Sequence, residues 1–171
     1  YWHNNPRFVQ KSAIYSLNRP LSLAYICFNV LAAQKIKKWA FNHQLSVEVW
    51  SFHNYCEHLV ELQGLDLDSV SSQAESENDY FEHVLPQFAL LYLQKTGHSQ
   101  PWDALVIDGL EDFRTQVFWD IIQASSHVHS SRWLSWDPGL LVGSSNPQAL
   151  NIVNHFKPNF PTWKLERNLR S

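Results

Sequence analysis

The residues best suited to chemistry follow a short apolar run in the second half of the chain. Asp108 comes directly after the apolar residues 104–107, and Glu111 and Asp112 follow within four positions. Four consecutive apolar residues predict a buried strand of a parallel sheet. Ligands of such sheets bind at the carboxyl ends of the strands, where a carboxylate can hold a magnesium ion beside a phosphate. The alternative for Asp108 is a helix N-cap, a position that also favours Asp.

The composition indicates a single folded domain of 171 residues. The chain is 44% hydrophobic and 14% aromatic, which is typical of a protein with a packed core. The net charge of −3 excludes a generally basic surface. Charge is nevertheless uneven, because residues 57–82 contain eight acids and no Lys or Arg, whereas basic residues gather at Lys35, Lys37 and Lys38 and again after residue 156. This pattern permits a local anionic partner, although solvated helical faces produce it too.

Cysteine usage and hydropathy predict a cytoplasmic protein. Cys27 and Cys56 belong to no CxxC pair, which argues against a disulfide framework or a structural zinc site. The sequence contains no visible signal peptide, and no apolar run approaches the roughly 18 residues that span a membrane. Because the chain has no Met and 5 Gly, we expect a piece of a longer protein, or a sequence from which residues are missing.

Strand-like and helix-like segments alternate along the chain. Strands are predicted near residues 21–28, 46–50, 104–107, 139–143 and 162–166. Helices are predicted after Asn29 and Ser51, over residues 80–96, from Phe113 onward and near residues 147–155. An acidic loop is expected at about residues 65–79 and a polar break at residues 125–131. Such alternation predicts one α/β domain over residues 1–171, with a mainly parallel sheet between helices.

Five short segments, in order, resemble the first RecA-like ATPase domain of UvrD/Rep-type superfamily-one DNA helicases, and in particular the branch found with nuclease-related domains. The segment from Trp102 to Phe113 resembles the Walker B motif of that family. The other four segments are Ile-Cys-Phe-Asn-Val-Leu-Ala at residues 26–32, Val-Glu-Val-Trp-Ser-Phe-His at 47–53, the acidic aromatic stretch at 79–86, and Asn-Leu-Arg-Ser at 168–171.

The resemblance implies a three-layer P-loop NTPase fold that binds ATP and Mg²⁺. Lys11 and Ser12 would then contact phosphate, with Ser12 and Asp108 as metal ligands. Arg170 would reach the γ-phosphate. The γ-phosphate sensor has two possible registers: Gln148, which we favour, or the segment Trp136-Asp137-Pro138-Gly139.

Two departures from the family pattern bear on activity. Asn5 and Gln10 occupy the glycine positions of the phosphate-binding loop, where side chains obstruct the approach of backbone N–H groups to phosphate. Gly109 replaces the Glu that would polarise the attacking water. Glu111, two residues further on, is the remaining candidate for that catalytic role.

The resemblance also implies single-stranded DNA as a partner, through Lys35, Lys38, Phe52 and His53. The alternative is that Phe52 is a core residue and that the lysines solvate a helix. A zinc site at His53, Cys56 and His58, or at His127 and His129, is less favoured than a structural role. We therefore expect an ATP-binding helicase motor domain that needs a second motor domain, absent from this chain, and no membrane. The alternative is a pseudo-ATPase that binds nucleic acid or protein.

Overall fold

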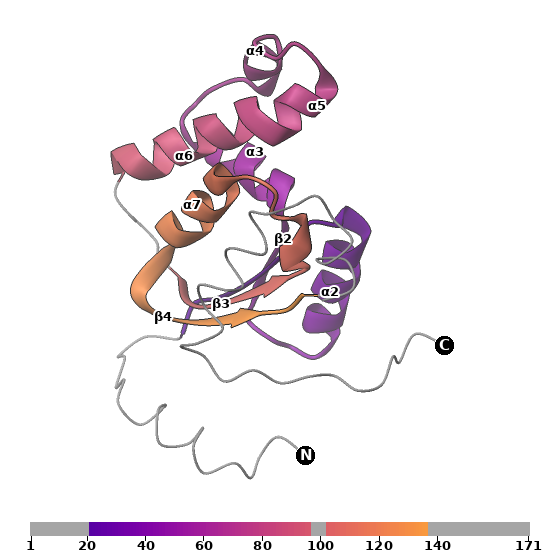
Figure 1. Ribbon diagram of the computed structural model, residues 1–171. Coiled ribbons are helices and arrows are strands. Elements are labelled where there is room, and N and C mark those ends of the chain that lie inside the picture. The colour runs from indigo at the N-terminus through magenta and orange to yellow at the C-terminus, as the bar shows by residue number, and fades with distance from the viewer. Residues whose placement is uncertain (1–20, 97–101, 137–171) are drawn as a thin grey trace.

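The computed structural model describes residues 21–96 and 102–136 of the chain. Within these ranges the chain forms a four-stranded sheet in which every strand runs parallel to its neighbours (Figure 1). The strands lie in the order β2 (Glu48–Ser51), β1 (Leu23–Cys27), β3 (Trp102–Asp108) and β4 (Ser126–Leu134). Helices supply the crossovers that parallel strands require. The predicted α/β class with a parallel sheet is therefore confirmed.

Helices cover both faces of the sheet, and the alternation of side chains along β1 explains why. Ala24 and Ile26 point into the larger core, where α3 (Phe52–Leu62), α6 (Leu85–Thr96) and α7 (Gln116–Ala124) pack. Tyr25 and Cys27 point to the opposite face, where they meet α2 (Val30–Asn42). The helix predicted after Asn29 is α2, and Asn29 caps it, because its Oδ1 accepts a hydrogen bond from the N–H of Ala32 at 3.0 Å.

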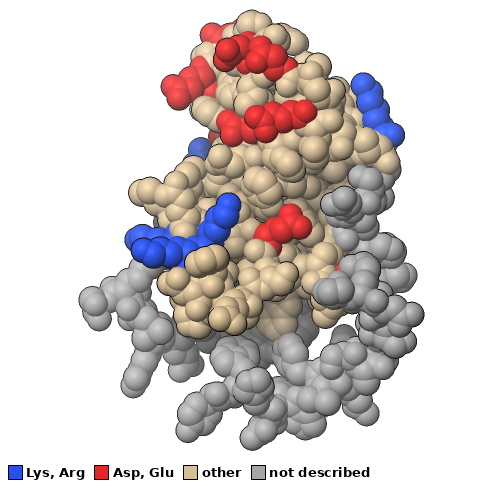
Figure 2. Space-filling view, turned by 180° about the vertical axis from the view of Figure 1, so that it is seen from behind, with Lys and Arg blue, Asp and Glu red and all other residues tan. Residues whose placement is uncertain are grey.

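The acidic segment is partly helical, so its prediction as a loop is wrong. It contains α4 (Leu67–Ser71) and α5 (Glu77–Asp79), whose N-caps are Asp66 and Ser76. These short helices form because capping side chains satisfy the free N–H groups at their first turns. Figure 2 shows the acidic side chains gathered at the end of the molecule that α4 and α5 form.

A π-helical turn, η1 (Tyr80–Val84), joins α5 to α6. The helix predicted over residues 80–96 thus changes from π to α geometry at Leu85, one residue before Pro86. Proline has no N–H to donate to the preceding turn, so a change of helix geometry there is expected. Pro86 and Leu85 are both buried, which anchors the start of α6 to the core.

The polar break expected at residues 125–131 is wrong, because β4 begins at Ser126. Its polar side chains find partners within the fold: Ser126 Oγ donates to the carbonyl of Ile122 at 3.1 Å, and Ser130 Oγ donates to the carbonyl of Trp102. Hydroxyls that are satisfied in this way carry little penalty when buried. The polar composition of residues 125–131 therefore led to the prediction of a break where the chain forms a strand.

Two large apolar side chains of these helices lie at the surface. Trp39 on α2 is 52% exposed and Leu62 at the end of α3 is 54% exposed. The strands predicted at 139–143 and 162–166, and the helix at 147–155, lie outside the described residues. In the two described ranges, no helix has the length and apolar character needed to cross a membrane.

Candidate functional site at the carboxyl edge of the sheet

Asp108 is the last residue of β3, a strand that lies between β1 and β4. Both of its carboxylate oxygens accept hydrogen bonds from hydroxyl groups. Tyr25 Oη on β1 donates to Oδ2 at 2.5 Å, and Ser135 Oγ, just beyond β4, donates to Oδ1. Asp108 is therefore oriented from both neighbouring strands.

Asp108 is not a helix cap in this structure. The short 3₁₀ helix η2 (Leu110–Asp112) has Gly109 at its N-cap position, and α7 has Thr115. The capping alternative for Asp108 is therefore wrong, because the hydrogen-bond donors to its carboxylate are side-chain hydroxyls rather than the N–H groups of a first helical turn.

Backbone hydrogen bonds fix Ser135 beside Asp108. The N–H of Ser135 donates to the carbonyl of Ile107 at 2.8 Å, and its carbonyl accepts from the N–H of Leu110 at 2.9 Å. The chain that leaves β4 is thus held against the turn that follows β3. Residues directly after β4 are brought to the edge where Asp108 lies.

Gly109 adopts a left-handed backbone conformation, with φ 76° and ψ 51°. A side chain at this position would be strained by roughly 1–2 kcal/mol, because the Cβ of an L-residue approaches its own carbonyl oxygen there. A Cβ at position 109 would lie 3.4 Å from Asp112 Oδ2 and 4.0 Å from Glu111 Oε1. The turn therefore suits glycine and brings two carboxylates close to it.

The carboxylates of η2 differ in their surroundings. Burial raises the pKa of Asp112 above its usual value, an effect that the positive charge of Arg114 partly offsets. Glu111 is half-buried. Phe113, which follows them, is fully buried and anchors the turn against Phe28 and Phe52.

Two of the four residues predicted to contact DNA belong to an aromatic cluster beneath this edge. Phe52 is fully buried, with its ring stacked on Phe28 at a centroid distance of 5.7 Å. Its ring therefore has no exposed face on which a base could stack. His53 is half-buried, and its Nε2–H donates to the carbonyl of Phe81 at 3.2 Å. Burial lowers the pKa of His53, and the hydrogen bond to Phe81 opposes that shift in part.

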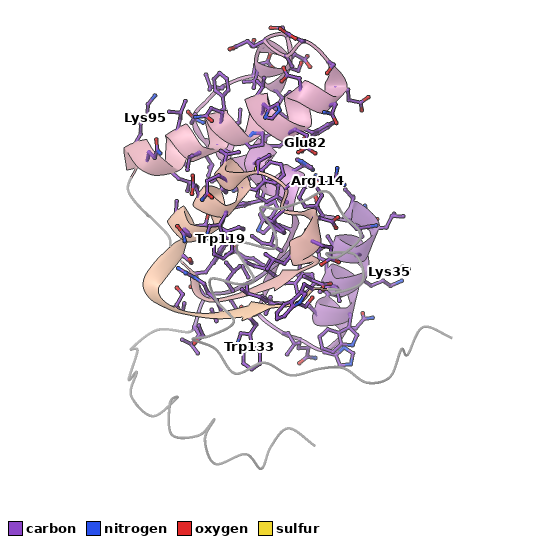
Figure 3. The ribbon with its side chains drawn as sticks, in the orientation of Figure 1. Lys35, Glu82, Lys95, Arg114, Trp119 and Trp133 are labelled. Carbon is purple, nitrogen blue, oxygen red and sulfur yellow. The ribbon has the colours of Figure 1, made fainter. Side chains whose placement is uncertain are left out.

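The other two, Lys35 and Lys38, are exposed on α2. Figure 3 shows Lys35 extending from α2 away from the sheet. Lys37 is exposed as well, and α2 itself contains no acidic residue. The exposed apolar side chains of the same helix are Val30, Leu31, Trp39 and Phe41.

The remaining predicted site residues have no described geometry. Lys11, Ser12, Gln148 and Arg170 all lie outside residues 21–96 and 102–136, as does Asp137 of the alternative register. The structure thus places Asp108 and Glu111 at one edge and Lys35 and Lys38 on α2.

Within residues 21–96 and 102–136, His53, Cys56 and His58 do not form a zinc site. No group of three or more His, Cys, Asp or Glu residues in the described ranges could hold a metal ion. Cys56 is fully buried, and the His53 ring packs edge-on against Phe28. Mg²⁺, in contrast, binds through one or two carboxylates together with phosphate and water oxygens. The Asp108 carboxylate is a group of this kind: one oxygen accepts a hydrogen bond from Tyr25 and the other from Ser135, and each carboxylate oxygen has two lone pairs.

Comparisons of the chain with family models, with curated proteins and with solved structures gave no match.

Tyr25 and Ser135 are the two site residues that sequence reasoning missed. Tyr25 could have been found, because it lies within the strand predicted at residues 21–28. It stands two positions before Cys27, the register partner of Asp108, and so on the same face of the sheet. Ser135 could not, because the strand before it was predicted to be a polar break.

Proposed function

We propose that this chain is a nucleotide-binding domain that binds ATP with Mg²⁺ at the carboxyl edge of its sheet, as part of a helicase-like motor that acts on single-stranded DNA. The observation that carries the proposal is the position of Asp108. It ends an inner parallel strand, and hydroxyls from both sides orient its carboxylate. Ligands of open α/β sheets bind at this edge.

Three of the segments that resemble UvrD/Rep-type helicases meet at this edge, which supports the proposal. The end of β1 leads through Phe28 and Asn29 into α2, and the end of β2 leads through Ser51 into α3. Cys27 is the register partner of both Ser51 and Asp108. Three of the five resembling segments are thus neighbours in space, as a shared ligand site requires.

In this proposal each residue has a defined task. Lys11 and Ser12 bind the phosphates, and Asp108 holds Mg²⁺ or its water shell while Arg170 contacts the γ-phosphate. Mg²⁺ neutralises charge that develops on the phosphates when it is bound. Gln148, or Asp137 in the alternative register, senses the γ-phosphate in this proposal, and both positions lie outside the described residues.

Single-stranded DNA is proposed to contact the exposed lysines of α2, Lys35 and Lys38. Phe52 is left out of this interface because its ring is buried. Translocation along DNA needs a second motor domain in addition to this one. The nucleotide site and the lysine helix belong to one domain, so ATP binding and DNA contact can be coupled through α2.

A second candidate function, a pseudo-ATPase that binds nucleic acid or protein, is favoured by the geometry at Gly109. The left-handed backbone at this position disfavours the catalytic Glu of the family. Glu111 is the group that could replace it, because its Oε1 lies close to the place where a side chain at 109 would begin.

Nucleotide binding and turnover separate these two functions. The full-length protein would be titrated with ATP and Mg²⁺ by calorimetry, and phosphate release would then be measured with and without single-stranded DNA. The motor proposal predicts binding together with DNA-stimulated release. Binding without release supports the pseudo-ATPase, and absence of ATP binding overturns the nucleotide site altogether.

A further inference from the structure

Two hydroxyl groups hold the Asp108 carboxylate from opposite sides, and they come from different parts of the chain. Tyr25 lies 83 residues before Asp108 and Ser135 lies 27 residues after it. Hydrogen bonds to an ionised carboxylate are stronger than those between neutral groups. Together they fix the rotation of the carboxylate, so its remaining lone pairs point in set directions before any ligand arrives.

The register of the sheet places the Tyr25 hydroxyl at this carboxylate. Cys27 is directly opposite Asp108, and Tyr25 lies two positions earlier on the same face of β1. The phenol ring therefore crosses diagonally to the end of β3, a reach that long aromatic side chains have between neighbouring strands. The ring also packs against the core cluster of Cys27, Ala33 and Val49 beneath α2. Packing thus holds the ring while its hydroxyl meets Asp108.

We propose that Tyr25 is a positioning residue of the nucleotide site, which with Ser135 orients the Asp108 carboxylate for a magnesium ion bound to nucleotide phosphates. This inference rests on the proposed function. It assigns a task to two residues that the helicase-like segments do not include. Residues that orient a metal ligand without touching the metal contribute strongly to metal affinity, because they remove the need to order the ligand on binding.

Tyr25→Phe is the sharpest test, because it removes only the hydroxyl and keeps the ring in the core beneath α2. Tyr55→Phe is the matched control. Tyr55 is buried, whereas Tyr25 is half-buried, and the Tyr55 hydroxyl donates to Ser125 Oγ at 2.9 Å within the larger core, on the other face of the sheet. Both variants lose one hydroxyl hydrogen bond, so a general loss of stability affects both.

The measurement is the affinity of full-length protein for ATP that carries a fluorescent label, determined once with Mg²⁺ and once with EDTA. The ratio of the two affinities isolates the magnesium-dependent part of binding. We expect Tyr25→Phe and Ser135→Ala each to lower this ratio by roughly 10-fold. In EDTA, all three variants are expected to bind ATP as tightly as the wild type does. Tyr55→Phe is also expected to keep the wild-type ratio.

The outcomes distinguish this inference from the function on which it rests. If the wild type binds labelled ATP in a magnesium-dependent way and Tyr25→Phe keeps the wild-type ratio, the positioning role is overturned and the nucleotide site stands. If the wild type shows no magnesium-dependent binding, the nucleotide site and the positioning role fall together. Thermal unfolding of each variant, recorded in EDTA, confirms that a lowered ratio comes from a folded protein.

Discussion

In the proposed function, the residue at position 109 limits ATP hydrolysis at the carboxyl edge of the sheet. Its left-handed backbone, with φ 76°, is comfortable for glycine and strained for any residue with a Cβ. A single Gly109→Glu substitution therefore does not reproduce the catalytic Glu of the UvrD/Rep-type helicases that the chain resembles. The backbone conformation at position 109 has to change as well.

We expect Gly109→Glu to lower the free energy of unfolding by about 1–2 kcal/mol and not to raise the rate of ATP hydrolysis above that of the wild type. Denaturant unfolding and phosphate release would be measured on the same samples. Gly64→Glu is the control for strain alone, since Gly64 has φ 74° and no atom lies near its missing Cβ. Faster hydrolysis by Gly109→Glu than by the wild type would show that the backbone there adapts to a side chain.

His53 provides a prediction of pH dependence. Burial lowers its pKa below the usual 6.5, so the folded protein binds this proton less tightly than the unfolded chain does. Neutral His53 therefore makes its full contribution to the free energy of unfolding above about pH 6.5. That contribution is lost as the pH falls toward the pKa of His53 in the folded protein. The carboxyls of Glu57 and Asp112 have raised pKa values and act in the opposite sense at lower pH.

We therefore expect the wild type to lose stability between about pH 7 and pH 5 more steeply than His53→Gln. Urea unfolding of both proteins at several pH values measures the difference, in which the contributions of Glu57 and Asp112 cancel. Parallel curves for the two proteins would mean that His53 takes up a proton as readily in the folded protein as in the unfolded chain.

At the scale of the elements, the regular helices and the inner strands could be predicted, and the polar strand could not. β1 and β3 are apolar runs, and α3 and α7 repeat apolar residues with helical spacing, so their positions follow from the sequence. β4 has serines and histidines at positions where the alternating pattern of a strand requires apolar residues. It is held in the sheet by pairing with β3, a contact between distant parts of the chain.

The site shows the same division. Asp108 could be found because an inner parallel strand precedes it. Its orientation by Tyr25 depends on the register between two strands, and its orientation by Ser135 depends on a strand that the pattern hides. Propensity does not encode either pairing, because both come from long-range contacts.

β4 offers a test of its polar packing. Arg132 donates to the buried Ser126 hydroxyl through both Nε and Nη2, at 3.2 and 2.9 Å. We expect Ser126→Ala to lower the free energy of unfolding by about 1–2 kcal/mol, because the half-buried guanidinium loses an acceptor. Ser71→Ala, at an exposed serine of α4, is the control and is expected to cost less. Equal costs in denaturant unfolding would contradict this account of β4.

At the scale of the whole molecule, charge is separated between two regions. The acids of residues 57–82 lie on α3 and on the α4–α5 end, while the lysines of α2 lie elsewhere on the surface (Figures 2 and 3). A molecule with a net charge of −3 can therefore attract a polyanion locally. Binding of this kind depends steeply on salt.

Replacing Lys35 and Lys38 together by Gln is expected to weaken binding of single-stranded DNA and to reduce the salt slope by about 1.4, since each phosphate contact contributes roughly 0.7. Fluorescence anisotropy with a labelled oligonucleotide at several salt concentrations gives the slope. Lys95→Gln is the control, because Lys95 is exposed near the end of α6. A slope unchanged from that of the wild type would remove α2 from the DNA interface.

The central claim is that Asp108 holds the magnesium ion of a bound nucleotide, and one substitution tests it directly. The affinity of the full-length protein for ATP would be measured with Mg²⁺ and with EDTA for the wild type, for Asp108→Ala, and for Asp68→Ala at an exposed acid of α4. The account predicts that Mg²⁺ strengthens binding by the wild type and by Asp68→Ala, and that Asp108→Ala loses most of this gain. An equal gain from Mg²⁺ in all three proteins would contradict the account.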